Sequence, residues 1–181
     1  MWRASVVSMV LLAACASNSP KPFEPPEQGQ YEDYEMAALP YEVEAIRDAM
    51  PVGFVYTYKI ESPLGLTFSR WEVLAVDAEG CTAKSTSLTE GGVVADERTL
   101  QMTWIEAIDA GFPAESAQRS EAQIETALGN FAVWRYVIGE VDEGVASSTT
   151  LYYAKSRPGP PILMELRRGD EVMRLEMVPN K

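Results

Sequence analysis

Apolar and polar residues alternate with a period of two through most of the chain after residue 53. The first such run, residues 54–60, carries three aromatic side chains and one isoleucine at alternate positions, which is typical of a strand with one buried face. Short segments rich in Gly, Asp and Pro separate the runs. The pattern predicts hairpins in which strands that are neighbours in sequence pair in space.

Two segments break this alternation and predict short helices. Residues 41–50 repeat apolar positions at a spacing of 3.6 residues between two prolines, which suits an amphipathic helix. Thr103 and Glu106 match the capping box, in which a hydroxyl and a carboxylate each bond an otherwise unpaired helix amide. A second short helix is therefore expected after Thr103, ending near Gly111.

The strand predicted at residues 131–141 is apolar on both faces, whereas the run before it, residues 123–127, is short. A strand of this kind is expected in the centre of a sheet, covered on both sides. Together these elements predict a mainly β (α+β) fold. We expect a strongly twisted antiparallel sheet or half-barrel of about eight strands, with two short helices on it.

The start of the chain follows a different pattern. Arg3 precedes an apolar stretch from Ala4 to Ala14, which is too short to span a bilayer and is typical of a secretory signal peptide. The tetrapeptide Leu12-Ala13-Ala14-Cys15 resembles the lipobox of bacterial lipoproteins, whose signal peptidase needs small residues before an invariant cysteine. An ordinary secretory signal with a chance cysteine is the alternative interpretation.

The lipobox resemblance implies that residues 1–14 are a signal peptide that is removed, and that Cys15 carries acyl chains such as palmitate as a membrane anchor. No aspartate follows Cys15 to act as an inner-membrane retention signal, so the resemblance favours the outer membrane, facing the periplasm. Residues 15–39, rich in Pro and Glu, predict an acidic, extended tether. Residues 40–181 then form a single β-rich envelope domain.

Charge narrows the range of partners. The chain has 15 Lys and Arg against 27 Asp and Glu, a formal charge of −12. Loss of residues 1–14 removes Arg3 and no acid, which leaves 14 basic residues against 27 acidic ones and a charge of −13. Because such a surface repels phosphate backbones and anionic lipid, no nucleic-acid partner is expected, and membrane contact is left to the acyl chains.

Residue types narrow the chemistry. The chain has no histidine, so Ser-His-Asp and Cys-His catalysis and the commonest transition-metal ligands are absent. With Cys15 lipidated, Cys81 has no disulfide partner, and we expect a small residue beside a β-turn rather than a reactive thiol. No enzymatic activity, metal or cofactor is therefore expected. Carboxylate-only chemistry, such as a glycosidase pair, survives because 27 acids are present.

Aromatic side chains recur at alternate positions of several predicted strands. Such rows usually form the core of a domain, but they can also line a cavity for a lipid or another ligand. The candidate ligand-binding residues are Tyr56, Tyr58, Trp71, Trp134, Tyr136 and Tyr153.

The order helix, hairpins, capped helix, hairpins resembles bacterial envelope lipoproteins of uncharacterised function. At the level of fold it is also similar to the half-barrel of the outer-membrane lipoprotein carrier and its receptor, a likeness that implies no shared activity. The segments that carry the first resemblance are Ala45-Ile46-Arg47, Gly53 before an aromatic strand, Glu125-Thr126-Ala127-Leu128-Gly129-Asn130-Phe131, and Tyr152-Tyr153-Ala154 before Pro158-Gly159-Pro160-Pro161.

Three functions remain open. The leading hypothesis is a non-enzymatic binding or structural lipoprotein of the cell envelope, whose hydrophobic ligand or envelope protein partner is unknown. The alternative is a carrier of lipid or another hydrophobic molecule in the concave face of a half-barrel, which requires an apolar cavity of several hundred Å³. A carboxylate-based hydrolase is the second alternative and requires two acids about 5–10 Å apart across a cleft.

Overall fold

The computed structural model describes residues 35–142 and 145–180, which belong to one compact unit that begins at Glu35. The expected signal peptide, Cys15 and most of the expected tether lie outside the described residues. No helix in the described part of the chain is long and apolar enough to cross a lipid bilayer.

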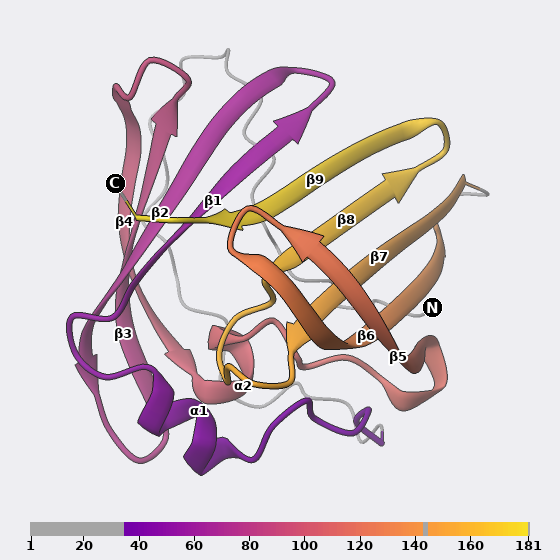
Figure 1. The fold of residues 1–181 in the computed structure, drawn as a ribbon, viewed down its shortest axis with the longest axis horizontal. Helices are drawn as coiled ribbons and strands as arrows, with labels where there is room; N and C mark the ends of the chain where they lie inside the picture. Colours follow the sequence, from indigo (N-terminus) through magenta and orange to yellow (C-terminus); the bar gives the residue numbers. More distant parts are fainter. Residues whose placement is uncertain (1–34, 143–144, 181) are drawn as a thin grey trace. The chain divides into compact units, whose positions relative to one another are not determined.

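The unit is built on one antiparallel sheet of nine strands. The strands are β1 (Val55–Ser62), β2 (Gly65–Val76), β3 (Gly80–Thr89), β4 (Val94–Thr103), β5 (Ala117–Thr126), β6 (Gly129–Asp142), β7 (Val145–Ala154), β8 (Leu163–Arg168) and β9 (Glu171–Val178). They pair in the order β4-β3-β2-β1-β9-β8-β7-β6-β5, so β9 joins the first half of the chain to the second (Figure 1). The sheet stays open, with β4 and β5 at its edges.

This architecture confirms the expected mainly β class and antiparallel hairpin order, with nine strands where about eight were expected. The largest difference is in β5, which begins at Ala117 although only residues 123–127 were expected to be extended. Residues 117–122 are mostly polar and show no buried face in sequence. They form a strand because each residue of β5 pairs with a residue of β6. This pairing is made by backbone groups and does not require apolar side chains.

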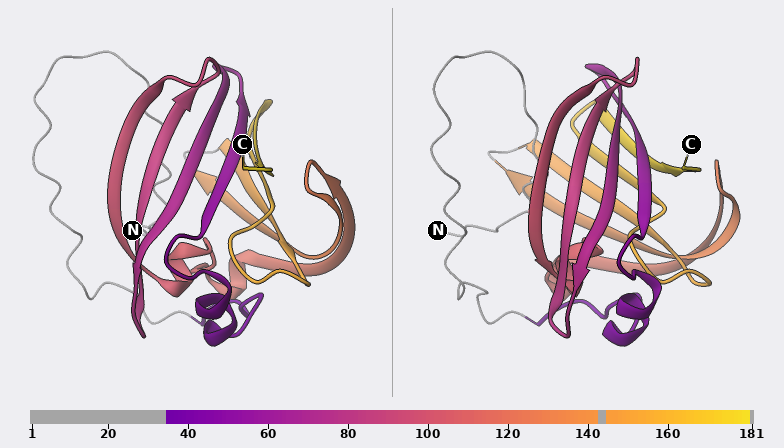
Figure 2. Two further views of the ribbon diagram at one scale, coloured as in Figure 1. Left: turned by 60° about the vertical axis from the view of Figure 1, so that its left-hand side comes forward. Right: turned by 90° about the vertical axis from the view of Figure 1, so that its left-hand side faces the viewer.

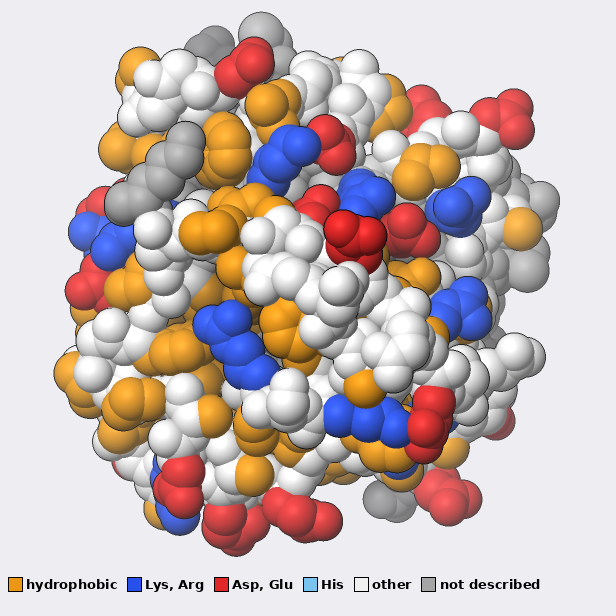
Figure 3. All heavy atoms as spheres, in the orientation of Figure 1, with side chains coloured by type: hydrophobic (Ala, Val, Ile, Leu, Met, Phe, Trp, Pro, Cys, Tyr) orange, Lys and Arg blue, Asp and Glu red, His pale blue; other side chains and the backbone are white. Residues whose placement is uncertain are grey.

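The first predicted helix is α1 (Val43–Ala49), and its apolar stripe faces inward as expected. Ile46 is fully buried and Met50, directly after the helix, is 1% exposed. Acidic side chains gather along the lower edge of the unit, over this helix (Figure 3). The amphipathic pattern of residues 41–50 therefore predicted both the helix and its buried face.

The second predicted helix is α2 (Trp104–Ala107), which begins at the expected capping box. The Thr103 amide donates to Glu106 Oε2 at 2.7 Å, and the Glu106 amide donates to Thr103 Oγ1 at 3.3 Å. Trp104 is 1% exposed and Ile108 is fully buried, so the helix and the residue after it dock through these two side chains. A three-residue 3₁₀ turn, η1 (Ala114–Ser116), follows before β5.

The helix α2 ends earlier than expected, because Asp109 rather than Gly111 takes the left-handed conformation, with φ of 54°. The Asp109 amide donates to Glu106 O at 3.0 Å, and the Ala110 amide donates to Ile105 O at 3.1 Å. These two bonds form the Schellman pattern that closes a helix, usually at glycine. Asp can hold this conformation at a modest cost in free energy, so it replaces the glycine that the pattern favours.

We call the face of the sheet that carries Tyr58 the inner face. The helices and the segment 108–113 cover this face at one end of the unit (Figures 1 and 2). The inner face and its cover form the main hydrophobic core, because both are apolar and only together do they exclude water. The buried side chains of the cover include Ile46, Met50, Trp104, Ile108 and Phe112.

The β5–β6 hairpin bends back on itself as a hook (Figure 2). Near its turn, the Ala127 amide donates to the Glu176 carboxylate of β9 at 2.7 Å. Glu176 points to the outer face, since its neighbour Met177 lies opposite Tyr58 on the inner face. The hook therefore lies against the outer face, where Val133 is fully buried and Leu163 is 6% exposed.

The prediction that the apolar strand at residues 131–141 is central in the sheet was wrong, since β6 lies next to the edge strand β5. Its two apolar faces have another cause. On the inner face Tyr136, 1% exposed, packs against Phe112 of the cover. On the outer face Val133 is buried by the bend of the hairpin. A strand beside an edge can thus be covered on both sides when its own hairpin folds over.

Gly80 provides a test of the β3–β4 pairing. A Cβ atom at this position would overlap the backbone oxygen of Met102, so Gly80→Ala forces the two strands apart. We expect Gly80→Ala to lower the free energy of unfolding in urea by about 2–4 kcal/mol. The matched control is Gly139→Ala in β6, where nothing lies within 4 Å and the change should stay below about 1 kcal/mol. Equal effects of the two substitutions would contradict this packing.

Candidate functional site

The six aromatic residues singled out in the sequence all lie on the inner face. Tyr56 lies opposite Trp71, and Trp134 lies opposite Tyr153. The strand register places both pairs on the same face of the sheet. Tyr58 pairs with Met177 in β9, and the residues on this face of β9 pair with residues of β8, which in turn pair with residues of β7. The structure therefore brings together two clusters of rings, one on β1 and β2 and the other on β6 and β7.

Four of these residues, all tyrosines, are buried, with exposures from 6% down to 0%. Three of their hydroxyls donate to backbone carbonyls of the covering segments. Tyr58 bonds Pro161 O at 2.6 Å, and Tyr136 bonds Ala38 O at 2.6 Å. Tyr153 lies 2.9 Å from the carbonyl oxygens of both Ile108 and Asp109. These hydroxyls are thus already used within the protein.

Burial also fixes the charge state of the tyrosine cluster. Burial raises the pKa of Tyr56, Tyr58 and Tyr153 well above the ordinary value, and the nearby Asp109 carboxylate raises these pKa values further. Burial raises the pKa of Tyr136 as well. The hydroxyls are therefore neutral hydrogen-bond donors rather than candidate bases.

The two tryptophans of the set are partly exposed. Trp71 stacks on Tyr56 with ring centroids 6.2 Å apart, and its buried Nε1 has no hydrogen-bond partner among the described residues. Trp134 lines a groove of about 640 Å³, together with Arg119 of β5 and residues 38–43. Trp134 is thus the member of the predicted set that borders open space at this groove.

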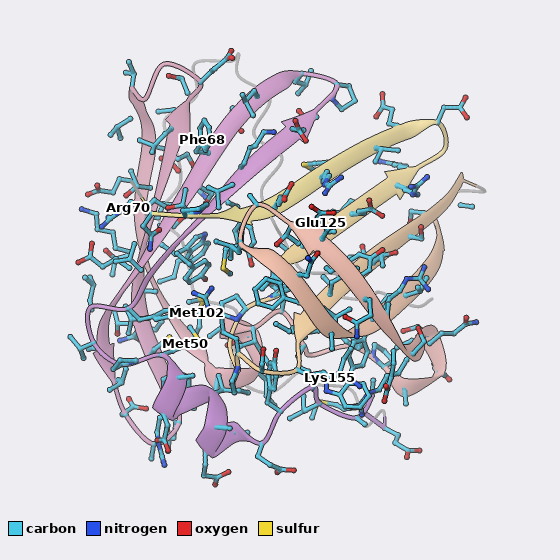
Figure 4. The ribbon with its side chains drawn as sticks, in the orientation of Figure 1. Met50, Phe68, Arg70, Met102, Glu125 and Lys155 are labelled. Atoms are coloured by element: carbon cyan, nitrogen blue, oxygen red, sulfur yellow. The ribbon has the colours of Figure 1, made fainter. Side chains whose placement is uncertain are left out.

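Two cations contact the ring of Trp134. The Arg119 guanidinium carbon lies 3.9 Å from the ring centroid, and Lys155 Nζ lies 3.8 Å from it. Lys155 is held by Glu121, whose carboxylate oxygen is 2.6 Å from Nζ. Lys155 and Glu121 also line a smaller hollow of about 240 Å³. Lys155 lies below Glu125 in Figure 4, and Glu125 is near the turn of the β5–β6 hairpin.

The sequence did not single out Arg119, Glu121, Lys155 or the groove wall at residues 38–43. Arg119 and Glu121 lie in the part of β5 that was not expected to be a strand. A regular alternation of apolar residues would have revealed the strand, and it is missing there. The wall falls at the expected boundary between the tether and the domain, where no motif marks it.

Cys81 lies in β3 directly after Gly80 and is 5% exposed. Burial, with a smaller effect from the Asp77 carboxylate, raises the pKa of its thiol above the ordinary value. The reactive thiolate form is therefore disfavoured at neutral pH, in agreement with a structural residue beside a turn. Within residues 35–142 and 145–180, no group of three or more Cys, Asp and Glu side chains is arranged to hold a metal ion.

No family model matches the chain, and no curated protein matches its sequence. Among solved structures, it is similar to the crystal structure of "a putative lipoprotein" from Parabacteroides distasonis, with a TM-score of 0.50 and 10% sequence identity. The match covers 71% of this chain and 94% of that protein. At this identity the likeness shows a shared fold.

Asp109 generates a prediction about pH. Burial beside the tyrosines raises the pKa of its carboxyl from 3.8 to about 6. The folded state thus holds the proton more tightly than the unfolded state, so this contribution to stability is complete below pH 4 and lost as the pH rises through 6. Asp109→Asn removes that loss and tolerates the same backbone conformation. We expect the variant to be more stable than the wild type by about 3 kcal/mol at pH 8.

Urea unfolding at pH 4, 6 and 8 checks this prediction, because the gain from Asp109→Asn should shrink toward pH 4. The matched control is Asp170→Asn, which removes a carboxyl from the exposed turn between β8 and β9. A gain that is the same at all three pH values would show that the carboxyl does not titrate as expected.

Proposed function

We propose that this chain is a bacterial envelope lipoprotein with a non-enzymatic binding or structural role. In this proposal it is cleaved before Cys15, lipidated there, and anchored to the outer membrane with its β domain in the periplasm. The observation that carries the proposal is the lipobox at the correct distance from Met1, followed by an acidic, Pro-rich segment.

The sequence before the compact unit supports a tethered display. The unit begins at Glu35, about 20 residues after Cys15. The intervening segment is acidic and rich in proline, a composition typical of an extended spacer. In this proposal the spacer lets the domain meet soluble or envelope partners away from the lipid surface.

The structure gives less support to the two alternatives. A carrier of hydrophobic molecules needs an apolar cavity on the concave face, but the tyrosines there are buried and bonded to the covering segments. A carboxylate-based hydrolase needs two facing acids. Among the residues that line the groove beside Trp134, the only acid is Glu42. Among those that line the smaller hollow, the only acid is Glu121. A binding or structural role for the domain surface is the function that the geometry supports best.

The anchor is tested by Cys15→Ser. In the native host grown with labelled palmitate, the variant should lose the label, and the protein should leave the membrane fraction. Cys81→Ser is the matched control, because that cysteine is buried in β3 and should leave labelling unchanged. Undiminished labelling of Cys15→Ser, or equal loss in both variants, would refute the assignment of Cys15 as the lipidated residue.

A further inference from the structure

Arg119 differs from most basic side chains of the described unit. Most of the others lie within salt-bridge distance of an acidic side chain, as expected where acids outnumber bases. Arg119 forms no salt bridge with any carboxylate in the described ranges, and its guanidinium carbon lies over the Trp134 ring instead, 3.9 Å from the centroid. A guanidinium placed over a ring face keeps N–H groups available for another partner. Arg119 thus offers unpaired donors at the wall of the groove.

Trp134 is enclosed between its two cations. Arg119 lies opposite Tyr136, on one side of Trp134 along β6. Lys155 lies on the other side, because its amide donates to Ala132 O. The two cations therefore contact opposite faces of the ring, and each lies within 4 Å of its centroid. Sugars and bases bind aromatic side chains through the ring face, so neither class suits this site.

The opposite wall of the groove is apolar and held in place. Residues 38–43 contribute alanine, leucine, proline and valine side chains to the lining, beside Tyr41 and Glu42. Tyr136 fastens the start of this wall by donating to Ala38 O, and the Tyr41 hydroxyl donates to Ala154 O at 2.7 Å. Both bonds join the wall to residues of the sheet, so the groove is already formed before a ligand binds. A preformed site loses less conformational freedom on binding, which favours affinity.

We propose that this groove binds a small amphipathic monoanion. The Arg119 guanidinium holds its carboxylate, and a short apolar body lies against residues 38–43 and the edge of Trp134. A guanidinium matches a carboxylate in a paired, two-bond geometry. The volume of about 640 Å³ lies within the range of small-molecule sites. Glu42 in the lining and the acid excess of the chain disfavour anions of higher charge.

This inference deepens the binding role proposed above and is independent of the lipid anchor. The test is isothermal titration calorimetry on the full chain purified from its host in a non-ionic detergent, whether or not Cys15 is acylated. Three soluble probes share one apolar body and differ in charge: phenylbutyrate, phenylbutanol and phenylbutylammonium. We expect saturable binding of phenylbutyrate alone. Arg119→Gln should weaken that binding at least about tenfold, and Arg119→Lys should restore part of it.

Arg135→Gln is the matched control, because Arg135 also lies in β6 but points to the outer face, where it cannot reach the groove. It removes the same charge and should leave binding unchanged. Val43→Glu is an independent test from the opposite wall, where the added carboxylate should repel phenylbutyrate. Thermal unfolding of each variant shows whether the fold is retained.

Equal binding of phenylbutanol, equal loss in Arg119→Gln and Arg135→Gln, or no saturable binding of phenylbutyrate by the folded wild type would each overturn the proposal. Palmitate labelling at Cys15 is a separate readout. The ligand proposal can thus fail while the anchor proposal stands, and the reverse holds as well.

Discussion

Hydrogen bonds from buried tyrosine hydroxyls to backbone carbonyls are the interaction on which the rest of this structure depends. The sheet is open, so its inner face must be covered by segments that bring polar backbone into an apolar site. An unpaired buried carbonyl costs free energy, and Tyr58, Tyr136 and Tyr153 remove that cost. Each ring also contributes apolar area, so one residue type both fills the core and fastens its cover.

The same bonds decide where a ligand can bind. With their hydroxyls in use and their rings buried, these tyrosines are part of the packed core under the cover. Open space instead lies at the margin, where Tyr136 and Tyr41 fasten residues 38–43 beside Trp134. The aromatic face is therefore the support of the groove, and the polar chemistry comes from the less apolar strand β5.

The bent β5–β6 hairpin links these features. Its bend places Val133 against the outer face while Tyr136 stays in the inner core, and the bond from Ala127 to Glu176 holds the turn. In the middle of the hairpin, Lys155 and Arg119 enclose Trp134. The hook thus stabilises an edge that would otherwise be a two-stranded extension with little buried area.

The sequence by itself determined the local elements. Alternation predicted the hairpins, the stripe at residues 41–50 predicted α1, and Thr103 with Glu106 predicted the start of α2, because each signal depends on residues a few positions apart. Tertiary structure alone decided the pairing of β9 with β1, the full length of β5 and the bend of its hairpin. It also decided the meeting of Arg119, Trp134 and Lys155. Backbone pairing does not depend on side-chain polarity, and contacts between distant segments produce no periodic pattern in the sequence. The sequence therefore could not predict these features.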